Sequence, residues 1–122
     1  MPGDLIRFIH SLFLPAARTY QEACWRPSAD VYQTAGGWLV KFDLAGVRPE
    51  DIRLSAAGRR LTLEGVRRDM TREQGCHYYR MEIAYNHFAR SLDLPVDLGQ
   101  AEIATEYREG MLLVRIREEA RS

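Results

Sequence analysis

The run from Gly37 to Val66 constrains the fold more than any other part of the chain. Apolar and polar residues alternate in three consecutive stretches of it, as expected for strands with one buried face. The alternating apolar residues are Trp38, Val40, Phe42 and Leu44, then Ile52, Leu54 and Ala56, then Leu61 and Leu63. Gly46 and Pro49 interrupt the first junction, and Gly58 interrupts the second. Three successive strands cannot bury this face alone, so further elements must cover it.

The remainder of the chain has the composition of more strands. They are predicted over Ala29 to Thr34, His77 to Ile83, Phe88 to Leu94, Ala101 to Tyr107 and Met111 to Ile116. About eight short strands with regular turn signals favour an all-β fold, an antiparallel immunoglobulin-like β-sandwich. A helical pattern between the strands is lacking, so a parallel α/β fold is not expected.

One predicted strand, His77 to Ile83, is isolated from the others. It follows the charged and aperiodic stretch from Arg67 to Gly75, which we interpret as a long loop. An isolated strand at the far end of a loop is suited to pairing with the sheet edge of another chain.

The N-terminal residues predict a short amphipathic helix before the sandwich. Its apolar residues recur at helical spacing: Leu5, Ile6, Ile9, Leu12 and Phe13. This face would pack on the domain or on a second copy, or would form a mobile arm that contacts other proteins, or would lie on a membrane surface. We divide the chain into an arm (1–24), a β domain (25–117) and a short charged tail (118–122).

Composition excludes several classes of function. The 122 residues suit one domain, and the formal net charge of zero argues against nucleic acid as a partner. Two cysteines, Cys24 and Cys76, favour a reducing cytoplasm over a disulfide scaffold. Arg7 and His10 interrupt the apolar run from Leu5 to Leu14, so neither a signal peptide nor a transmembrane span is expected.

A search for catalytic or metal-binding constellations points to a protein that is not an enzyme. A phosphate-binding loop and a nucleophile elbow are both missing, and the adjacent Cys76 and His77 lack the spacing of zinc ligands. Neighbouring side chains on a strand point to opposite faces, so His77 is badly placed to activate the Cys76 thiol. We therefore expect no catalytic residues, metal or cofactor. A disulfide between two copies through Cys76 is an alternative under oxidation.

The order of motifs resembles a known family. Trp25 to Thr34 is similar to the entry of an α-crystallin domain, and Phe42 to Ile52 resembles its Asp-Leu-Pro-Gly-Val-x-x-Glu-Asp-Ile segment. Tyr78 to Glu82, followed by Phe88 to Pro95, looks like its dimerisation strand and the next strand. Ala104 to Leu112 is similar to its closing signature. The chain thus resembles the small heat-shock proteins, in their bacterial form, from Trp25 to Ile116.

This resemblance implies an ATP-independent holdase, which binds partly unfolded client proteins and prevents their aggregation under stress. It also implies a homodimer, or a higher oligomer, in which each chain exchanges a strand with its partner. The residues implied in that interface are Val31, Tyr32, Tyr78, Tyr79, Arg80, Glu82 and Arg90. Clients would contact the arm residues Leu5, Ile6, Ile9, Leu12 and Phe13, and an apolar groove would be lined by Ile52, Leu54, Ala56, Ile103 and Thr105.

Some residues depart from the pattern or need a partner. Ala45 replaces the usual proline, and the family's Ile-x-Ile/Val motif is missing after Ile116. Arg90 lies on the apolar face of its predicted strand, so we expect it to contact a carboxylate. The alternative to a holdase is a co-chaperone-like β-sandwich adaptor that binds one folded partner.

Overall fold

The structure, a computed structural model, describes residues 25–118 and contains seven β-strands in that range. Two short 3-10 helices, η2 and η3, lie between strands. The elements are β1 (Ala29–Thr34), β2 (Gly37–Asp43), η2 (Pro49–Asp51), β3 (Ile52–Ala57), β4 (Arg60–Arg67), β5 (Asn86–Asp93), η3 (Leu98–Gln100), β6 (Ala101–Arg108) and β7 (Met111–Glu118). The predicted helical arm (1–24) and residues 119–122 lie outside the described residues.

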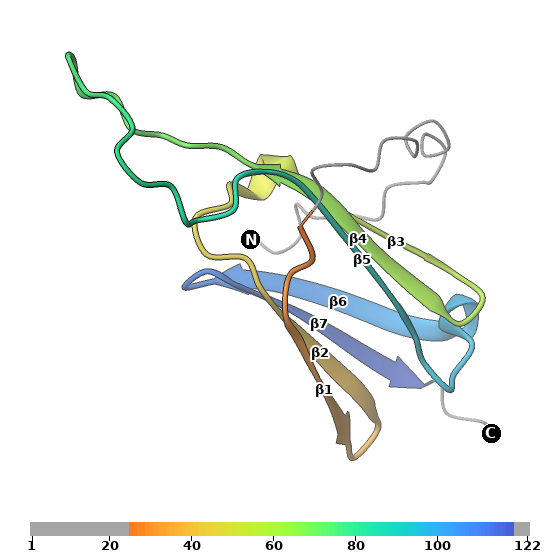
Figure 1. The fold of residues 1–122 in the computed structure, drawn as a ribbon. Helices are drawn as coiled ribbons and strands as arrows, with labels where there is room; N and C mark the ends of the chain where they lie inside the picture. The colour runs from red at the N-terminus through yellow and green to blue at the C-terminus, as the bar shows by residue number, and fades with distance from the viewer. Residues whose placement is uncertain (1–24, 119–122) are drawn as a thin grey trace.

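The strands form the two antiparallel sheets of a sandwich (Figure 1). One sheet has the order β1-β2-β7-β6 and the other has the order β3-β4-β5. β1 is an edge strand of the first sheet, and its register with β2 runs from Ala29 opposite Phe42 to Thr34 opposite Gly37. The prediction of an all-β antiparallel sandwich is confirmed.

The core lies between the two sheets and consists of the residues that the alternating pattern predicted. Val40 and Phe42 of β2 are fully buried, as are Leu54 of β3 and Leu61 and Leu63 of β4. β7, which pairs with β2 in the first sheet, adds three further core residues, namely Leu112, Val114 and Ile116. Burial of one face per strand is what holds the two layers together.

Close packing between β4 and β5 depends on one glycine. The ring of Phe88 lies over Gly65, its partner in the β4–β5 register. A methyl group added at Gly65 would overlap both the Phe88 ring and the backbone oxygen of Asp51. The missing side chain therefore admits the Phe88 ring to the core, where it is 1% exposed.

The prediction of a strand over His77 to Ile83 is wrong for the single chain. Those residues have no regular structure, and β4 and β5 are joined by a long segment that projects from the sandwich (Figure 1). A strand requires a neighbour that pairs with its backbone, and none of the described strands runs beside this segment. Within residues 25–118, no helix is long and apolar enough to cross a membrane.

Gly65→Ala tests the packing under Phe88. We expect it to lower the free energy of unfolding by about 1–3 kcal/mol, because the added methyl group must displace an aromatic ring or the backbone. Urea denaturation of the two proteins measures the difference. Gly36→Ala is the matched control, since a methyl group there would make only an ordinary contact with Arg117. Equal stability of Gly65→Ala and the parent protein would contradict the packing argument.

Candidate self-association surfaces

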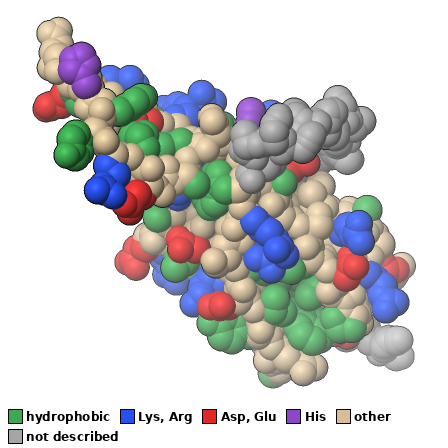
Figure 2. Space-filling view, in the orientation of Figure 1, with side chains coloured by type: hydrophobic (Ala, Val, Ile, Leu, Met, Phe, Trp, Pro, Cys, Tyr) green, Lys and Arg blue, Asp and Glu red, His purple; other side chains and the backbone are tan. Residues whose placement is uncertain are grey.

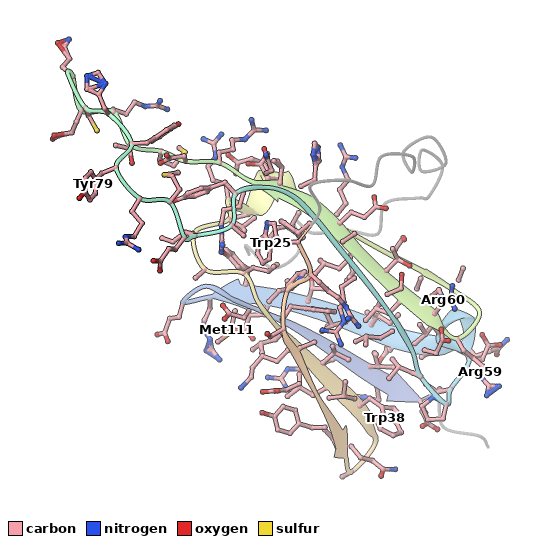
Figure 3. All side chains as sticks on the ribbon, viewed as in Figure 1. Trp25, Trp38, Arg59, Arg60, Tyr79 and Met111 are labelled. Atoms are coloured by element: carbon pink, nitrogen blue, oxygen red, sulfur yellow. The ribbon has the colours of Figure 1, made fainter. Side chains whose placement is uncertain are left out.

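A projecting segment, residues 68–85, is the most exposed part of the described chain. Every residue from 70 to 84 is exposed, and Tyr79 is 96% accessible to solvent. Figure 3 shows Tyr79 on this segment, well away from the body of the sandwich. The two limbs line a shallow hollow, with Asp69, Thr71 and Glu73 on one side and residues 76–83 and Tyr85 on the other.

Exposed large apolar side chains of the described residues are confined to two places. Val31 (44%) and Tyr32 (42%) lie on the edge strand β1. The others all belong to the projecting segment: Met70, Tyr78, Tyr79, Met81 and Ile83. Figure 2 shows hydrophobic side chains near the base of the projection and over the β1–β2 end of the sandwich. Apolar surface on an edge strand invites another strand to pair with it.

The base of the projecting segment is fixed by Arg67, the last residue of β4. Two of its nitrogens, Nε and Nη2, donate to the Ala84 carbonyl at 2.9 and 2.7 Å, and Nη1 donates to the Ala45 carbonyl at 3.0 Å. Its guanidinium carbon also lies 4.2 Å from the centre of the Trp25 ring. One side chain therefore joins both limbs of the projection to the entry of the domain.

The next residue, Arg68, makes a forked ion pair with Asp51 at 3.0 Å for each contact. Arg48 Nε lies 3.6 Å from the same carboxylate, which is 10% exposed. The hydrogen bonds from Arg68, with the charges of both arginines, hold the pKa of Asp51 below its usual value despite partial burial. The outgoing limb is thereby fixed to η2.

The predicted groove residues divide into two groups. Ile52 and Leu54 are buried in the core between the sheets, at 6% and 0% exposure. Ala56 on β3 and Ile103 and Thr105 on β6 are half-buried. The surface of the single chain therefore presents only these last three members of the predicted set. β3 and β6 are both edge strands of their sheets, which leaves the groove as a proposal.

Within residues 25–118, Arg90 contacts a backbone oxygen in place of the carboxylate that we expected. Its Nη1 donates to the Pro27 carbonyl at 2.8 Å, and the salt bridges among residues 25–118 do not include it. A backbone oxygen can accept from a guanidinium without the cost of burying a second charge. Its Nε is buried without a hydrogen-bond partner in the described part of the chain. Arg90 thus fixes the segment before β1 onto β5.

Of the interface residues on the projecting segment, Tyr78 and Tyr79 are exposed and Arg80 lies 3.5 Å from Glu82 in an exposed ion pair. Cys76 is a free, exposed thiol. Residues 25–118 contain no group of three or more histidine, cysteine or acidic side chains that could hold a metal ion. Leu5, Ile6, Ile9, Leu12 and Phe13, with Cys24, lie outside the described residues.

Two residues at the base of the projecting segment were missed by reasoning from sequence. Trp25 was interpreted only as the entry to the domain and Arg67 only as the start of a loop. Their contact joins two parts of the chain that are far apart in sequence, so no periodic pattern could reveal it. The only signal was an aromatic residue before a Pro-containing linker and an arginine at the end of an alternating stretch.

Solved structures share this architecture. A small heat-shock protein from Xylella fastidiosa is 27% identical, with a TM-score of 0.66 over 80% of this chain and 90% of that one. The hspA protein of Xanthomonas axonopodis is 26% identical, with a TM-score of 0.64 over 77% and 94% of the two chains. The sandwich is thus the α-crystallin domain of small heat-shock proteins.

The sequence profile of the Hsp20/alpha crystallin family matches residues 30–122, and the chain belongs to that family. Small heat shock protein C2 of Rickettsia felis is 27% identical over 90 residues, which cover 74% of this chain. The chain spans between 53% and 60% of the length of three of the curated relatives that it matches.

Asp51→Asn tests the ion pair at the base of the projection. The pKa of Asp51 is lowered in the folded chain, so its contribution to stability is present above the unfolded pKa, near 3.8. That contribution is lost as the pH falls through the lower folded pKa. We expect the variant to be less stable than the parent at pH 7, with a stability difference that is smaller at a pH below 3.8.

Urea denaturation at both pH values measures this difference. The variant Arg68→Gln and the double variant complete a cycle that isolates the pair. An unchanged difference at low pH, or additive single effects, would contradict the assignment.

Proposed function

We propose that this protein is an ATP-independent holdase that binds partly unfolded proteins and prevents their aggregation under stress. Membership of the Hsp20/alpha crystallin family supports a chaperone role. A holdase needs apolar surface that complements the patches exposed by unfolded clients, and it needs no nucleotide. We further propose that the protein is not an enzyme and acts in the cytoplasm.

We propose that two copies associate by exchange of strands. Residues 77–83 of one copy would lie along β1 of the other and complete its four-stranded sheet on the open side. The observation that carries this proposal is the confinement of exposed large apolar side chains, in residues 25–118, to β1 and the projecting segment. Pairing the two would bury both sets together and would supply partners for two unpaired backbone edges.

The proposed interface uses Val31 and Tyr32 on one side and Tyr78, Tyr79, Arg80 and Glu82 on the other. Arg90 would lie near it through its contact with Pro27. The small heat-shock protein from Xylella fastidiosa has a distinct high-order structure, and this supports a further association of dimers into larger oligomers here. Ala56, Ile103 and Thr105 are the groove residues best placed to serve such contacts.

We assign client binding to the arm residues Leu5, Ile6, Ile9, Leu12 and Phe13. Their helical apolar spacing supports this assignment, because such a face can cover exposed apolar patches on a client. The apolar surface of the projecting segment would be covered in the dimer.

Proline substitutions test the strand exchange. In an extended strand the backbone N–H groups of neighbouring residues point to opposite sides, so Tyr79→Pro or Arg80→Pro must remove a donor to β1. We expect one of the two to weaken the dimer about tenfold or more, measured by sedimentation over a range of concentrations.

Glu73→Pro is the matched control, because it lies in the same exposed segment but outside residues 77–83. The folded sandwich should not respond to any of these changes. If both variants dimerise as the parent does, the exchanged strand is not residues 77–83.

Light scattering of a heat-denatured model client, without nucleotide, tests the chaperone activity. We expect suppression of aggregation at near-stoichiometric ratios. The variant Ile9→Asp with Phe13→Asp should suppress aggregation less, because charge on the apolar face disfavours contact with apolar client surface. Arg7→Asp on the polar side of the same stretch is the control. No suppression by the parent protein at any temperature would favour the single-partner adaptor instead.

A further inference from the structure

The contacts at the base of the projecting segment point beyond the exchange itself. We propose that Arg67 and Trp25 form a latch that sets the direction in which residues 68–85 leave the sandwich. Neither residue belongs to the proposed interface, so both would act as positioning residues for dimer formation. The consequence for dimers rests on the proposed function, whereas the effect on the segment's direction does not.

Arg67 has the geometry of a clamp. Its Nε and Nη2 hold a single oxygen, that of Ala84, where the returning limb reaches the sandwich. Its Nη1 holds the Ala45 oxygen in the turn after β2. The guanidinium plane thus links the returning limb to the opposite sheet. A guanidinium can do this because its donors are rigidly arranged in one plane.

Trp25 supplies the surface on which the clamp rests. Its backbone is tied to β5 on both sides, since its N–H donates to the His87 oxygen at 3.0 Å and its oxygen accepts from Ala89 at 3.1 Å. The indole ring lies 5.2 Å from the Phe88 ring and 4.2 Å from the Arg67 guanidinium carbon. Figure 3 shows Trp25 between the two layers, below the point where the projecting segment begins.

Contacts of the ring, and no hydrogen bond from its nitrogen among the described residues, orient the indole of Trp25. Its Nε1 is buried and has no hydrogen-bond partner among the described residues. Packing on Phe88 and the cation–π contact with Arg67 therefore fix the ring orientation. The Tyr85 ring, with its centre 5.8 Å from the same guanidinium carbon, extends this stack onto the returning limb.

The backbone at the same place turns sharply. Asn86, which pairs with Arg67 at the end of the β4–β5 ladder, has a φ of 85°. A left-handed residue redirects the chain, and asparagine tolerates that conformation better than most residues. The turn fixes where the segment bends, and the clamp on Ala84 fixes which way it continues. Beyond this point, residues 70–84 are all exposed to solvent.

Trp25 also directly follows residues 1–24 in the chain, to which we assign client binding. A force or contact that displaces Trp25 would remove the surface under Arg67 and release Ala84. The latch therefore couples the start of the domain to the direction of the projecting segment. Through this coupling, the arm would influence the position of the proposed dimer interface without contacting it.

Distance measurement between two spin labels tests the latch. The labels are placed at Met81→Cys on the returning limb and at Ala57→Cys at the exposed end of β3, with Cys24→Ser and Cys76→Ser. The full chain is used, and labelled protein is diluted into excess unlabelled protein so that each assembly carries one labelled chain. Arg67→Lys keeps the charge but loses the planar fork, and Trp25→Leu keeps an apolar side chain but loses the ring.

We expect both variants to give a broader or shifted distance distribution, and to raise the concentration for half-dimerisation about tenfold. Arg60→Lys is the matched control for the arginine, because it lies at the other end of β4 in a forked contact with Asp93. Trp38→Leu is the control for the tryptophan, because Trp38 packs on the core from β2. Thermal unfolding of each variant confirms that the sandwich is folded.

Distributions of Arg67→Lys and Trp25→Leu that match the parent would overturn the latch, as would equal broadening by the two controls. A parent protein that is monomeric at every concentration would overturn the strand exchange. In that case the distance distribution still decides the latch by itself.

Discussion

The contact of the Phe88 ring with Gly65 is the packing interaction on which the rest of the structure depends. It lets the Phe88 ring pack over the β4 backbone, and the centre of the same ring lies 5.2 Å from that of the Trp25 ring. Trp25 in turn supports Arg67, and Arg67 holds the base of the projecting segment. Four successive contacts therefore connect a missing side chain on β4 to the base of a surface that lies outside the sandwich.

Much of the sandwich could be predicted from the sequence, because a strand with one buried face has an apolar residue at every second position. Val40 and Phe42, and likewise Leu61 and Leu63, are predicted to point to the buried face, and all four are fully buried. Strand ends were less accurate: the strand predicted from Phe88 to Leu94 runs from Asn86 to Asp93. The end of a ladder depends on where the partner strand stops, and this is a tertiary property.

The candidate surfaces were harder to predict, for different physical reasons. Residues 77–83 have the composition of a strand, but a strand exists only when a neighbour pairs with its backbone. For Arg90, sequence reasoning required a compensating charge and missed that the Pro27 carbonyl could serve instead. The groove that the resemblance implies stays a proposal, and its members Ile52 and Leu54 are buried between the sheets of the single chain.

The closure of the projecting segment at its base has a consequence for the evolution of such chains. Arg67, at the end of β4, donates to the Ala84 oxygen. The two ends of the projecting segment are therefore held together whatever the number of residues between them. Doubling the length of a loop costs only about 0.6 kcal/mol in closure entropy. Insertions, deletions and wholesale replacement within it are therefore nearly neutral for the sandwich. Under the strand exchange proposed above, changes in this segment would alter which copies pair with one another and leave the core of the sandwich intact.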